Sequence, residues 1–432
     1  MSKVKDASLS KKGADELSWA RANMPVLARI RARFEKEKPF AGLTISVALH
    51  LEKKTGVLLE ILSAGGARVF ASSCNPLTTN DATAAALAAA GKIEVFAWAN
   101  QTNEEYYSCL NAVLDGKPSI VIDDGCDLIN LLHTSRKEEL PKIIGACEET
   151  TTGINRLNAM QKAGKLLFPV FAVNNAHSKF LLDNQFGTAQ STVDAIARAT
   201  NLIFAGKTVV VAGYGWCGRG VASRMKGMGA NVVVVEIDGT LGPHESGLHR
   251  ALFAQYDGFR VMDMPSAARI GDIFITATGN KNVIGKEHFA LLKGGAILSN
   301  TGHFNVEIDE PALRAQSKRV RDVKENLVAY EQKDGRTIYL LSEGRLVNLA
   351  QPSGQGHPIE IMDGSFALQA LCCELIAKSA KAGAKRMASG VHAVPVDVDN
   401  EVARLLLAAK GIKLQEPTAE QKKYAESFEE GT

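Results

Sequence analysis

Short apolar runs alternate with helical patterns along most of the chain. In the first part, strands are predicted at Thr44–Leu49, Arg68–Ala71, Glu94–Ala97, Ser119–Ile122 and Leu167–Ala172, and helices at stretches such as Lys54–Ala64 and Asp81–Ala90. This alternation of strand and helix is typical of an α/β fold with parallel sheets. It predicts one α/β domain that ends near residue 185.

A second series of strands and helices opens at Lys207–Ala212. Its further strands are predicted at Asn231–Glu236, Arg260–Met262, Ile273–Thr276 and Ala296–Ser299. From Pro352 onward a loop is expected, followed by a long helix, Ser365–Ala382, which could pack back on the first domain. The tail, Asn400–Thr432, is charged and helical in pattern and resembles an appendage more than a domain.

Length and composition fit an ordinary globular enzyme of two domains. The chain has 432 residues, of which 46% are hydrophobic and 22% charged, and its formal net charge is only +3. A chain of this length usually exceeds what one core serves. Scattered basic residues argue against nucleic acid as a partner, and no run is long enough to span a membrane.

The cysteines and the N-terminus indicate a cytoplasmic protein. The seven cysteines are odd in number and form no CxxC pair, so reduced thiols are expected, with neither disulfides nor a metal site. The segment Met1–Lys12 is polar, and no apolar stretch follows it, so no signal peptide is predicted.

The strongest motif is GxGxxG at Gly213, Gly215 and Gly218. It follows a β-branched run and opens a helical pattern, Val221–Gly227, and the next strand ends at Glu236, about 20 residues on. Such glycines allow a tight turn and close approach of a pyrophosphate to the helix N-terminus. Glu236 would accept hydrogen bonds from the ribose hydroxyls and repel a 2′-phosphate, which favours NAD over NADP. The alternative is a purely structural glycine-rich turn.

Several polar groups fall at predicted strand ends or in glycine-rich loops. They are Asp123-Asp124-Gly-Cys-Asp127, Glu148-Glu149-Thr150-Thr151-Thr152-Gly153, Lys179 with Asp183 and Asn184, and the histidines His50, His303 and His357. The carboxyl ends of parallel strands are where α/β proteins bind ligands. Each group also has a structural interpretation: a surface ion pair, a helix cap or a hydrogen-bonded histidine. On these residues alone the chain is an NAD-dependent oxidoreductase of unknown substrate.

Together these motifs resemble the S-adenosyl-L-homocysteine hydrolase family, over about residues 15 to 425. The resemblance rests on Ser-Ser-Cys-Asn at 72–75, Asp-Asp-Gly at 123–125, Glu-Glu-Thr-Thr-Thr-Gly at 148–153, Lys179 with Asp183-Asn184, Val-Ala-Gly-Tyr-Gly at 211–215, Gly-His-Phe-Asn-Val-Glu-Ile-Asp at 302–309 and Glu-Gly-Arg-Leu-Val-Asn-Leu at 343–349. It implies a Rossmann-type NAD-binding domain, a larger α/β substrate domain and a homotetramer.

The resemblance also implies the reaction, which is hydrolysis of the thioether of a nucleosidyl-homocysteine. Oxidation at C3′ by tightly held NAD acidifies the C4′ hydrogen, homocysteine is eliminated, water adds, and the ketone is reduced again. Two rivals remain: an ordinary dehydrogenase that releases NADH, and an inactive NAD-binding homologue.

By the same resemblance, site residues receive roles. Lys179 would be the base at the 3′-hydroxyl with Asp183, while His50 and Asp124 would transfer protons at C4′ and C5′ with His303 close by. Glu149 would bind the ribose. The remaining assignments are Glu52, Lys54, Asn184, His357 and Met362 at the substrate, and Thr150, Thr151, Thr152, Asn184, Gly213, Gly215, Gly218, Glu236, Asn300 and Asn348 at the cofactor.

One departure from the family concerns the purine base. In the common form a Thr and a Glu follow His50 at two and four residues; here Glu52 and Lys54 stand there. A carboxylate only accepts and an ammonium only donates, which matches the N1–H and 6-oxo groups of hypoxanthine and mismatches adenine. The sequence therefore predicts a preference for S-inosyl-L-homocysteine. The alternative is that Glu52 and Lys54 pair with each other and a conventional adenosylhomocysteinase results.

Other departures lie elsewhere along the chain. The tail lacks the Lys and Tyr that in the family reach a neighbour's NAD, an insertion spans Gly239–His249, and Thr188 replaces a Cys. The expected division is a substrate domain over 1–187, an NAD-binding domain over 188–352, a returning substrate segment over 353–390 and a helical tail over 391–432 that contacts other subunits.

Overall fold

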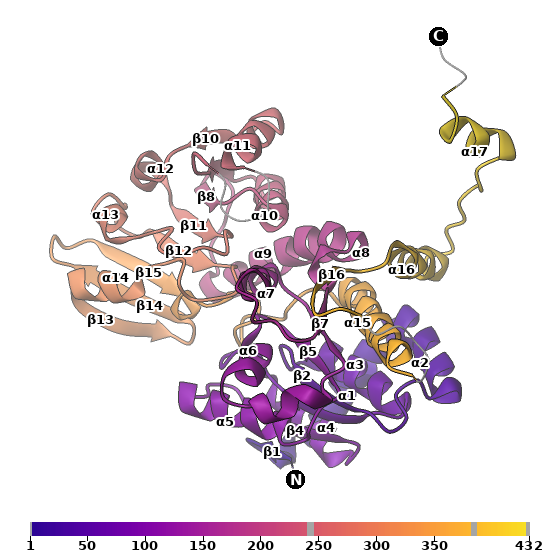
Figure 1. Cartoon of the computed structure of the whole chain (residues 1–432). Coiled ribbons are helices and arrows are strands. Elements are labelled where there is room, and N and C mark those ends of the chain that lie inside the picture. The colour runs from indigo at the N-terminus through magenta and orange to yellow at the C-terminus, as the bar shows by residue number, and fades with distance from the viewer. Residues whose placement is uncertain (1, 240–245, 382–386, 429–432) are drawn as a thin grey trace.

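Two eight-stranded sheets, each covered by helices, make up the body of the protein (Figure 1). A computed structural model describes residues 2–239, 246–381 and 387–428. Parts of the predicted insertion (240–245) and tail (429–432), and Ala382 at the end of the predicted long helix, lie outside the described residues. Within the described ranges, no helix is long and apolar enough to cross a membrane.

The first sheet, sheet A, is parallel throughout, in the order β1-β4-β3-β2-β5-β6-β7-β16. Its central strands are buried on both faces, as parallel strands between helical layers must be. The strands are β1 (Lys3–Val4), β2 (Thr44–Ala48), β3 (Arg68–Ser72), β4 (Ile93–Ala97), β5 (Ile120–Asp123), β6 (Gly145–Glu148), β7 (Pro169–Ala172) and β16 (Gly390–Ala393).

Sheet B has the order β10-β9-β8-β11-β12-β15-β14-β13, and only its last two pairings are antiparallel. The parallel part is a Rossmann-type sheet. Its strands are β8 (Thr208–Ala212), β9 (Asn231–Val235), β10 (Arg260–Met262), β11 (Ile273–Thr276), β12 (Ile297–Asn300), β13 (Ser317–Lys324), β14 (Leu327–Gln332) and β15 (Thr337–Leu341).

Each sheet has one point at which the direction of strand addition reverses. In sheet A the chain runs from β2 outward to β4 and then returns to β5 on the other side of β2. In sheet B it runs from β8 to β10 and returns to β11 beside β8. A crevice forms at such a switch point, outside the carboxyl ends of the strands, and it is where open α/β sheets bind ligands.

The helices cover both sheets, and two of them connect distant parts of the chain. Helix α15 (Ile359–Ser379) follows sheet B in sequence but packs with α2 and α3 in the core of sheet A (Figure 1). Helix α9 (Thr188–Thr200) packs on α10 at the start of sheet B. The other helices are α1 (Ser10–Ala22), α2 (Pro25–Glu37), α3 (Lys53–Ala64), α4 (Asp81–Ala89), α5 (Asn103–Leu114), α6 (Asp127–Thr134), α7 (Thr151–Lys162), α8 (His177–Lys179), α10 (Trp216–Gly227), α11 (Gly247–Tyr256), α12 (Met264–Ile270), α13 (Lys286–Phe289), α14 (Glu310–Gln316), α16 (Val396–Ala409) and α17 (Ala419–Ala425).

A carboxylate of α15 fixes the start of α2. The Asp363 side chain accepts hydrogen bonds from the backbone N–H groups of Val26 and Leu27, at 2.9 and 2.8 Å. The start of α2 has Pro25 in its first turn and receives no side-chain cap from the preceding residue. Asp363 therefore supplies from a distant element the capping that helix N-termini require.

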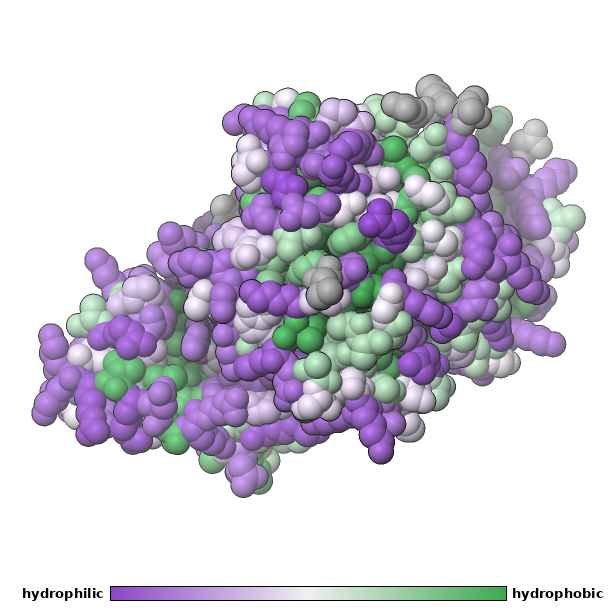
Figure 2. All heavy atoms as spheres, turned by 90° about the horizontal axis from the view of Figure 1, so that it is seen from below, coloured by the Kyte–Doolittle hydropathy of each residue, from purple (hydrophilic) through white to green (hydrophobic). Residues whose placement is uncertain are grey.

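The surface carries apolar side chains that the single chain leaves uncovered. Helix α17 buries none of its residues and extends away from the body (Figure 1). On the face seen in Figure 2, hydrophobic residues gather near the middle and hydrophilic residues surround them. Large exposed apolar side chains include Tyr256, Ile203 and Val396.

The α/β fold class predicted from the pattern is confirmed, with strand ends shifted by a residue or two. Helix α15 begins at Ile359, six residues before the predicted start, because Pro358 is its N-cap and the intervening Met362 and Asp363 are buried inside it. Strand β6 and the meander β13–β15 were not predicted. The sequence of β13, Ser317–Lys324, is mostly exposed and charged, so its pattern does not resemble a buried strand.

Candidate active site and cofactor site

One large cavity of about 1550 Å³ lies at both switch points and draws its walls from both sheets. Single small-molecule sites typically occupy about 300–1,000 Å³, so this cavity has room for two ligands together. Its lining includes the predicted site residues His50, Glu52, Lys54, Asp124, Glu149, Thr150, Thr151, Thr152, Lys179, Asp183, Asn184, Gly213, Gly215, Glu236, His303, Asn348, His357 and Met362. Gly218 and Asn300, also predicted at the site, do not line the cavity.

The glycine-rich turn after β8 fits a dinucleotide. Gly213 has φ of +96° and lies against the Ala277 carbonyl that follows β11, so the turn has no room for a side chain. A Cβ on Gly218 would lie 1.8 Å from the Gly213 oxygen, which shows how closely α10 approaches the strand. Gly215, the N-cap of α10, faces open space, so a pyrophosphate could approach its backbone.

Glu236 follows β9 at the same edge and is almost entirely buried. Its carboxylate accepts hydrogen bonds from the Tyr214 backbone N–H at 2.5 Å and from the Arg250 guanidinium, whose Nε lies 2.8 Å from Oε1. Arg250, on α11, also lines the cavity. The predicted ribose-binding acid is thus in the expected place, with a cation that sequence reasoning did not single out.

Lys179 lies at the junction of the two sheets, surrounded by oxygen atoms. Its Nζ donates to Asp183 Oδ1 at 3.0 Å and to Asn184 Oδ1 at 2.8 Å, and lies 3.5 Å from Glu149 Oε1. Residues Phe180–Gly187 form a π-helix, whose widened turn brings the residues at i+4 and i+5 to one side chain. This geometry explains why Asp183 and Asn184 both reach Lys179.

The charges of this cluster depend on one another. Burial alone would lower the pKa of Lys179, but the carboxylates of Asp183 and Glu149 outweigh it and raise the pKa above its ordinary value. Burial opposes ionisation of Asp183 too, yet Lys179 and His357 hold its pKa well below the usual range. Burial raises the pKa of Glu149 to about 8, although Lys179 opposes the shift. Lys179 and Asp183 are therefore an ionised pair at neutral pH.

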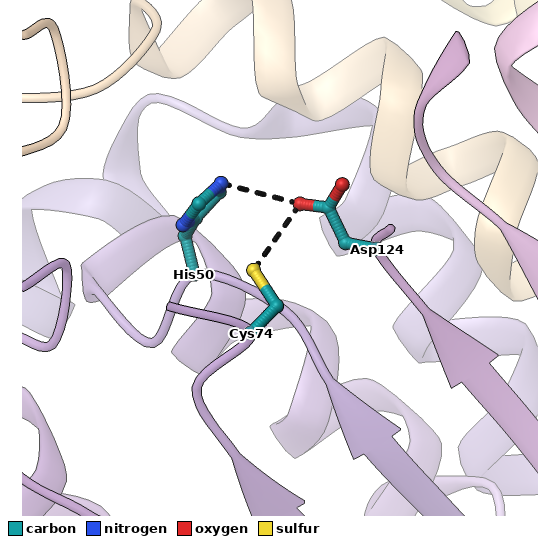
Figure 3. A group of neighbouring side chains, drawn as sticks. All are labelled: His50, Cys74 and Asp124. Atoms are coloured by element: carbon teal, nitrogen blue, oxygen red, sulfur yellow. Dashed lines mark hydrogen bonds and ion pairs between the residues drawn. The ribbon is translucent and has the colours of Figure 1, made fainter. Parts of the chain in front are cut away.

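The second polar cluster lies at the switch point of sheet A, where His50 follows β2 and Asp124 follows β5 (Figure 3). His50 Nε2 lies 3.3 Å from Asp124 Oδ2, and the Cys74 thiol donates to the same oxygen at 3.4 Å. These three ligand atoms lie within 4.8 Å of one another, a spacing that could also hold a metal ion. His303 Nδ1 lies 3.6 Å from the other Asp124 oxygen.

The protonation of this cluster follows from its burial. Burial lowers the pKa of His50 to about 4, against the opposing effect of Asp124, so the imidazole is neutral at neutral pH. Burial and the Asp124 carboxylate raise the pKa of the Cys74 thiol well above its usual value, which keeps it protonated. His50 Nδ1 meets the Thr78 hydroxyl at 2.8 Å, so Nε2 faces Asp124. This cluster can accept and return a proton.

Two acids behind the second cluster hold it in place. Asp123 accepts from the Asp124 and Ile129 backbone N–H groups, and burial raises its pKa to about 7. Glu148 accepts from the Gly125 N–H at 2.8 Å. Gly125 has φ of +101°, and a Cβ there would lie 2.3 Å from His303 Nε2, so this turn has room for His303 only because it carries glycine.

Glu52 and Lys54 form a buried ion pair at the cavity wall near His50. Glu52 is the N-cap of α3 and accepts from the Lys54 backbone N–H at 3.2 Å. Lys54 Nζ lies 3.0 Å from Glu52 Oε2 and donates to the Gln355 carbonyl at 2.9 Å. Burial lowers the pKa of Lys54, and Glu52 opposes that shift. The two side chains therefore pair with each other and also line the cavity.

The amides predicted at the cofactor fall into two groups. Asn184 donates to Asn174, which donates to Thr151, so these residues connect the cavity wall to the start of α7. Asn348 lines the cavity and donates to Ser191 of α9 at 3.1 Å. Asn300 instead accepts from Thr276 and donates to the Gly302, Phe304 and Gly344 carbonyls. It orders the loop that carries His303.

His357 and Met362 close the cavity beside the Lys179 cluster. His357 Nδ1 lies 3.0 Å from Asp183 Oδ1, and its Nε2 meets the Thr188 hydroxyl at 3.3 Å. Met362 lies on the first turns of α15. Thr188, which stands where the family commonly has a Cys, thus contacts the histidine of the loop before α15.

Sequence reasoning missed two polar residues of α15 that hold the Lys179 cluster. Ser365 donates to Asp183 Oδ2 at 2.7 Å, and Gln369 donates to Glu149 Oε2 at 2.5 Å. Both are fully buried. The available signal was two polar residues four apart within an apolar helical run, which place both side chains on one face of the helix.

Comparison with known proteins agrees with this geometry. Residues 1–143 match the family model described as S-adenosyl-L-homocysteine hydrolase, and residues 184–354 match that described as S-adenosyl-L-homocysteine hydrolase, NAD binding domain. The chain is 54% identical over 432 residues to S-inosyl-L-homocysteine hydrolase of Methanocaldococcus jannaschii, covering all of both chains. It is 53% identical over 430 residues to the protein of the same name from Methanopyrus kandleri, covering 99% of this chain and 98% of that one. It is 52% identical over 429 residues to adenosylhomocysteinase of Thermococcus kodakarensis, with the same shares covered.

Proposed function

The chain belongs to the S-adenosyl-L-homocysteine hydrolase family and uses NAD, and we propose that it hydrolyses S-inosyl-L-homocysteine in preference to the adenosyl compound. The observation that carries the preference is the Glu52–Lys54 pair at the cavity wall. Two relatives of nearly equal identity carry the inosyl name and one the adenosyl name. Sequence identity alone therefore does not decide which purine base the enzyme prefers. The preference has to be argued from the residues of the base pocket.

The Lys179 cluster is suited to the 3′-hydroxyl of the ribose. NAD, when bound, accepts a hydride from the sugar and later returns it. Lys179 and Glu149 hydrogen-bond the sugar hydroxyls, and Asp183 and Asn184 fix the position of Lys179. Because the pKa of Lys179 is raised, Lys179 must give up a proton before it can act as the base at that hydroxyl.

The His50–Asp124 cluster is suited to the other end of the sugar. Neutral His50 accepts a proton, and Asp124 receives or returns one through the 3.3 Å contact. His303, also against Asp124, contributes from the opposite wall. Elimination of homocysteine and addition of water each require a proton to be moved at C4′ or C5′, which two adjacent groups of this kind provide.

The charge pair at the base pocket fits hypoxanthine. Glu52 presents an acceptor to N1–H, and Lys54 presents a donor to the 6-oxo group. Adenine would face a carboxylate with its unprotonated N1 and an ammonium with its amino group. A site built on such hydrogen bonds can discriminate by about 10⁴-fold because a mismatch leaves buried polar groups unpaired. The two residues pair with each other in the free site, but both are buried, unlike a surface pair of little energetic weight.

The test is kcat/KM for the inosyl and adenosyl compounds, measured side by side. The unmodified enzyme should favour the inosyl compound strongly, and Glu52→Thr with Lys54→Glu should reverse the preference. Lys53→Glu is the control, because it repeats the Lys54→Glu substitution one residue away and Lys53 does not line the cavity. The Lys53→Glu variant should keep the preference of the unmodified enzyme for the inosyl compound.

Other outcomes have definite meanings. Equal or better use of the adenosyl compound by the unmodified enzyme would make it a conventional adenosylhomocysteinase. Accumulation of NADH during turnover would indicate an ordinary dehydrogenase. Absence of turnover with either compound would indicate an NAD-binding homologue without activity.

The division of the chain and its assembly also belong to the proposal. We propose a substrate domain over 1–187, an NAD-binding domain over 188–352, a returning segment over 353–390 and a tail over 391–432. The boundary at 390 needs correction, because strand β16 (Gly390–Ala393) pairs with β7 in sheet A, so the returning segment extends at least to Ala393. We propose a homotetramer in the cytoplasm. The uncovered apolar residues on α11 and the unpacked α17 support the assembly part of this proposal, because they leave surfaces that further subunits would cover. Light scattering should give four times the chain mass of 46.2 kDa.

A further inference from the structure

Glu236 and Arg250 form a bidentate ion pair at the ribose end of the proposed cofactor site. Arg250 Nε lies 2.8 Å from Oε1 and Nη2 lies 3.3 Å from Oε2, and the two side chains are 17% and 5% exposed. The carboxylate also accepts from the Tyr214 and Ile237 backbone N–H groups. Glu236 is therefore held from two sides, with backbone donors on one and a guanidinium on the other.

The two members of this pair favour opposite cofactors. An acid after the second strand of a Rossmann sheet accepts the ribose 2′-hydroxyl of NAD, whereas a nearby arginine accommodates the 2′-phosphate of NADP. Guanidinium groups bind phosphate through two parallel N–H···O hydrogen bonds. Here the acid and the arginine line the same end of one cavity and neutralise each other.

We propose that Arg250 is a specificity-determining residue whose affinity for a 2′-phosphate is masked by Glu236. While the pair is intact, Glu236 accepts the 2′-hydroxyl and occupies two guanidinium donors. Without the carboxylate, those donors face the cavity and bind a phosphate. Arg250 thus orients Glu236 toward NAD and is the reason a single substitution would admit NADP.

Among the described residues that line the cavity, one other acid lies close to this end. Asp263 follows β10, whose Met262 pairs with Val235 beside Glu236, and it also lines the cavity. Its side chain is engaged as the N-cap of α12, accepting from the Ser266 N–H at 2.7 Å. Asp263 would weaken phosphate binding by its charge, but its hydrogen bond to Ser266 holds it at the helix start.

The experiment measures binding of NAD and of NADP to cofactor-stripped full-length protein by calorimetry. Glu236→Ser should weaken NAD and tighten NADP, each by about tenfold or more, the size expected for one charged hydrogen bond. Adding Arg250→Ala to that variant should abolish the gain in NADP affinity. Glu236→Gln, which keeps the side-chain shape, gives a second route to the same comparison.

Controls and contrary results separate this inference from the proposed function. Arg224→Ala, an exposed arginine of α10 outside the cavity lining, should leave both affinities unchanged. An NADP gain that survives Arg250→Ala, or no gain in either Glu236 variant, would overturn the proposal. Because binding is measured without substrate, failure here leaves the base preference untouched.

Discussion

The charge on Lys179 has to be reconciled with its proposed use as a base. Three oxygen atoms surround its Nζ, and two of them belong to carboxylates. The arrangement that positions the amine therefore also keeps it protonated. A buried amine with such partners is activated only when one partner is neutralised or moved away.

This argument predicts a pH dependence for the oxidation half-reaction. With its pKa raised, Lys179 loses its proton only at alkaline pH, so single-turnover formation of reduced nicotinamide should speed up as pH rises. Asp183→Asn removes the carboxylate that raises the pKa most and should move the midpoint to lower pH, although the rate at the plateau falls. Stopped-flow absorbance over neutral to alkaline pH measures both quantities.

Asp194→Asn is the control for that series. Asp194 is an exposed acid of α9 paired with Arg198, away from the cavity. It should leave the midpoint where it is. A midpoint that stays fixed in Asp183→Asn, or rises, would show that Lys179 is not the titrating group.

At the scale of elements, α15 holds the Lys179 cluster from behind. Ser365 and Gln369, one turn apart, each donate to one of the two carboxylates that flank Lys179. Further along, Glu374 pairs with Arg33 of α2. One buried helix therefore fixes both the core of sheet A and the orientation of the two acids beside Lys179.

Loss of either donor on α15 should impair positioning more than binding. Ser365→Ala and Gln369→Met are expected to lower kcat by about 10- to 100-fold, the range that small misplacement of reacting groups produces. KM should change much less, because neither residue lines the cavity. Steady-state kinetics with the preferred substrate would separate the two parameters.

The helix provides its own controls. Ser379→Ala removes a hydroxyl bonded to the Ile376 carbonyl at the far end of α15 and should be nearly silent. Ser365→Thr keeps the hydroxyl and should recover most of the activity. A KM rise with unchanged kcat in Ser365→Ala would contradict a positioning role.

Some elements and site residues could be predicted from sequence for physical reasons. Strands such as β2 and β8 are buried on both faces and leave continuous apolar runs, so periodicity finds them. Gly213, Gly215 and Glu236 were predicted because the backbone geometry of a dinucleotide turn restricts residue type and spacing, and the structure places all three at the cavity wall. These features are local in sequence.

Contacts between distant segments could not be predicted in the same way. Ser365 meets Asp183, and Arg250 meets Glu236, only after the chain folds. Sequence spacing can mark Ser365 as a buried polar residue, but it does not identify the partner in either contact. Asn300 was predicted at the cofactor, and nothing in the sequence indicated that its amide donates to the carbonyls of the neighbouring loops. The exposed strand β13 also escaped prediction, because its stability comes from pairing with β14 and not from burial.

At the scale of the whole molecule, the proposed cofactor site and the proposed substrate site are two ends of one cavity. Gly213 and Glu236 come from sheet B, His50 and Asp124 from sheet A, and all four line the same cavity. Two ligands bound in this cavity would therefore lie close together. Occupancy of one end should slow release from the other.

This coupling can be measured directly. Bound NAD should dissociate several-fold more slowly when inosine is present than when it is absent, because two ligands that share one cavity raise each other's affinity when they contact each other or the same residues. Release is followed by trapping free NAD with an excess of a dehydrogenase. If the base pocket favours hypoxanthine, adenosine should protect less at equal concentration. Identical release with and without nucleoside would mean that the two ends act independently.

Because α15 follows sheet B in sequence but packs against sheet A, the nascent chain is affected during its synthesis. Strands β2–β7 leave the ribosome before the helix that covers them has been synthesised, since all of sheet B is encoded between them and α15. At about 5–20 residues per second, that interval lasts roughly ten to forty seconds. During translation the half-built sheet keeps an apolar face open to chaperones and to other nascent chains, and a circular permutant that begins at α15 would close it from the start.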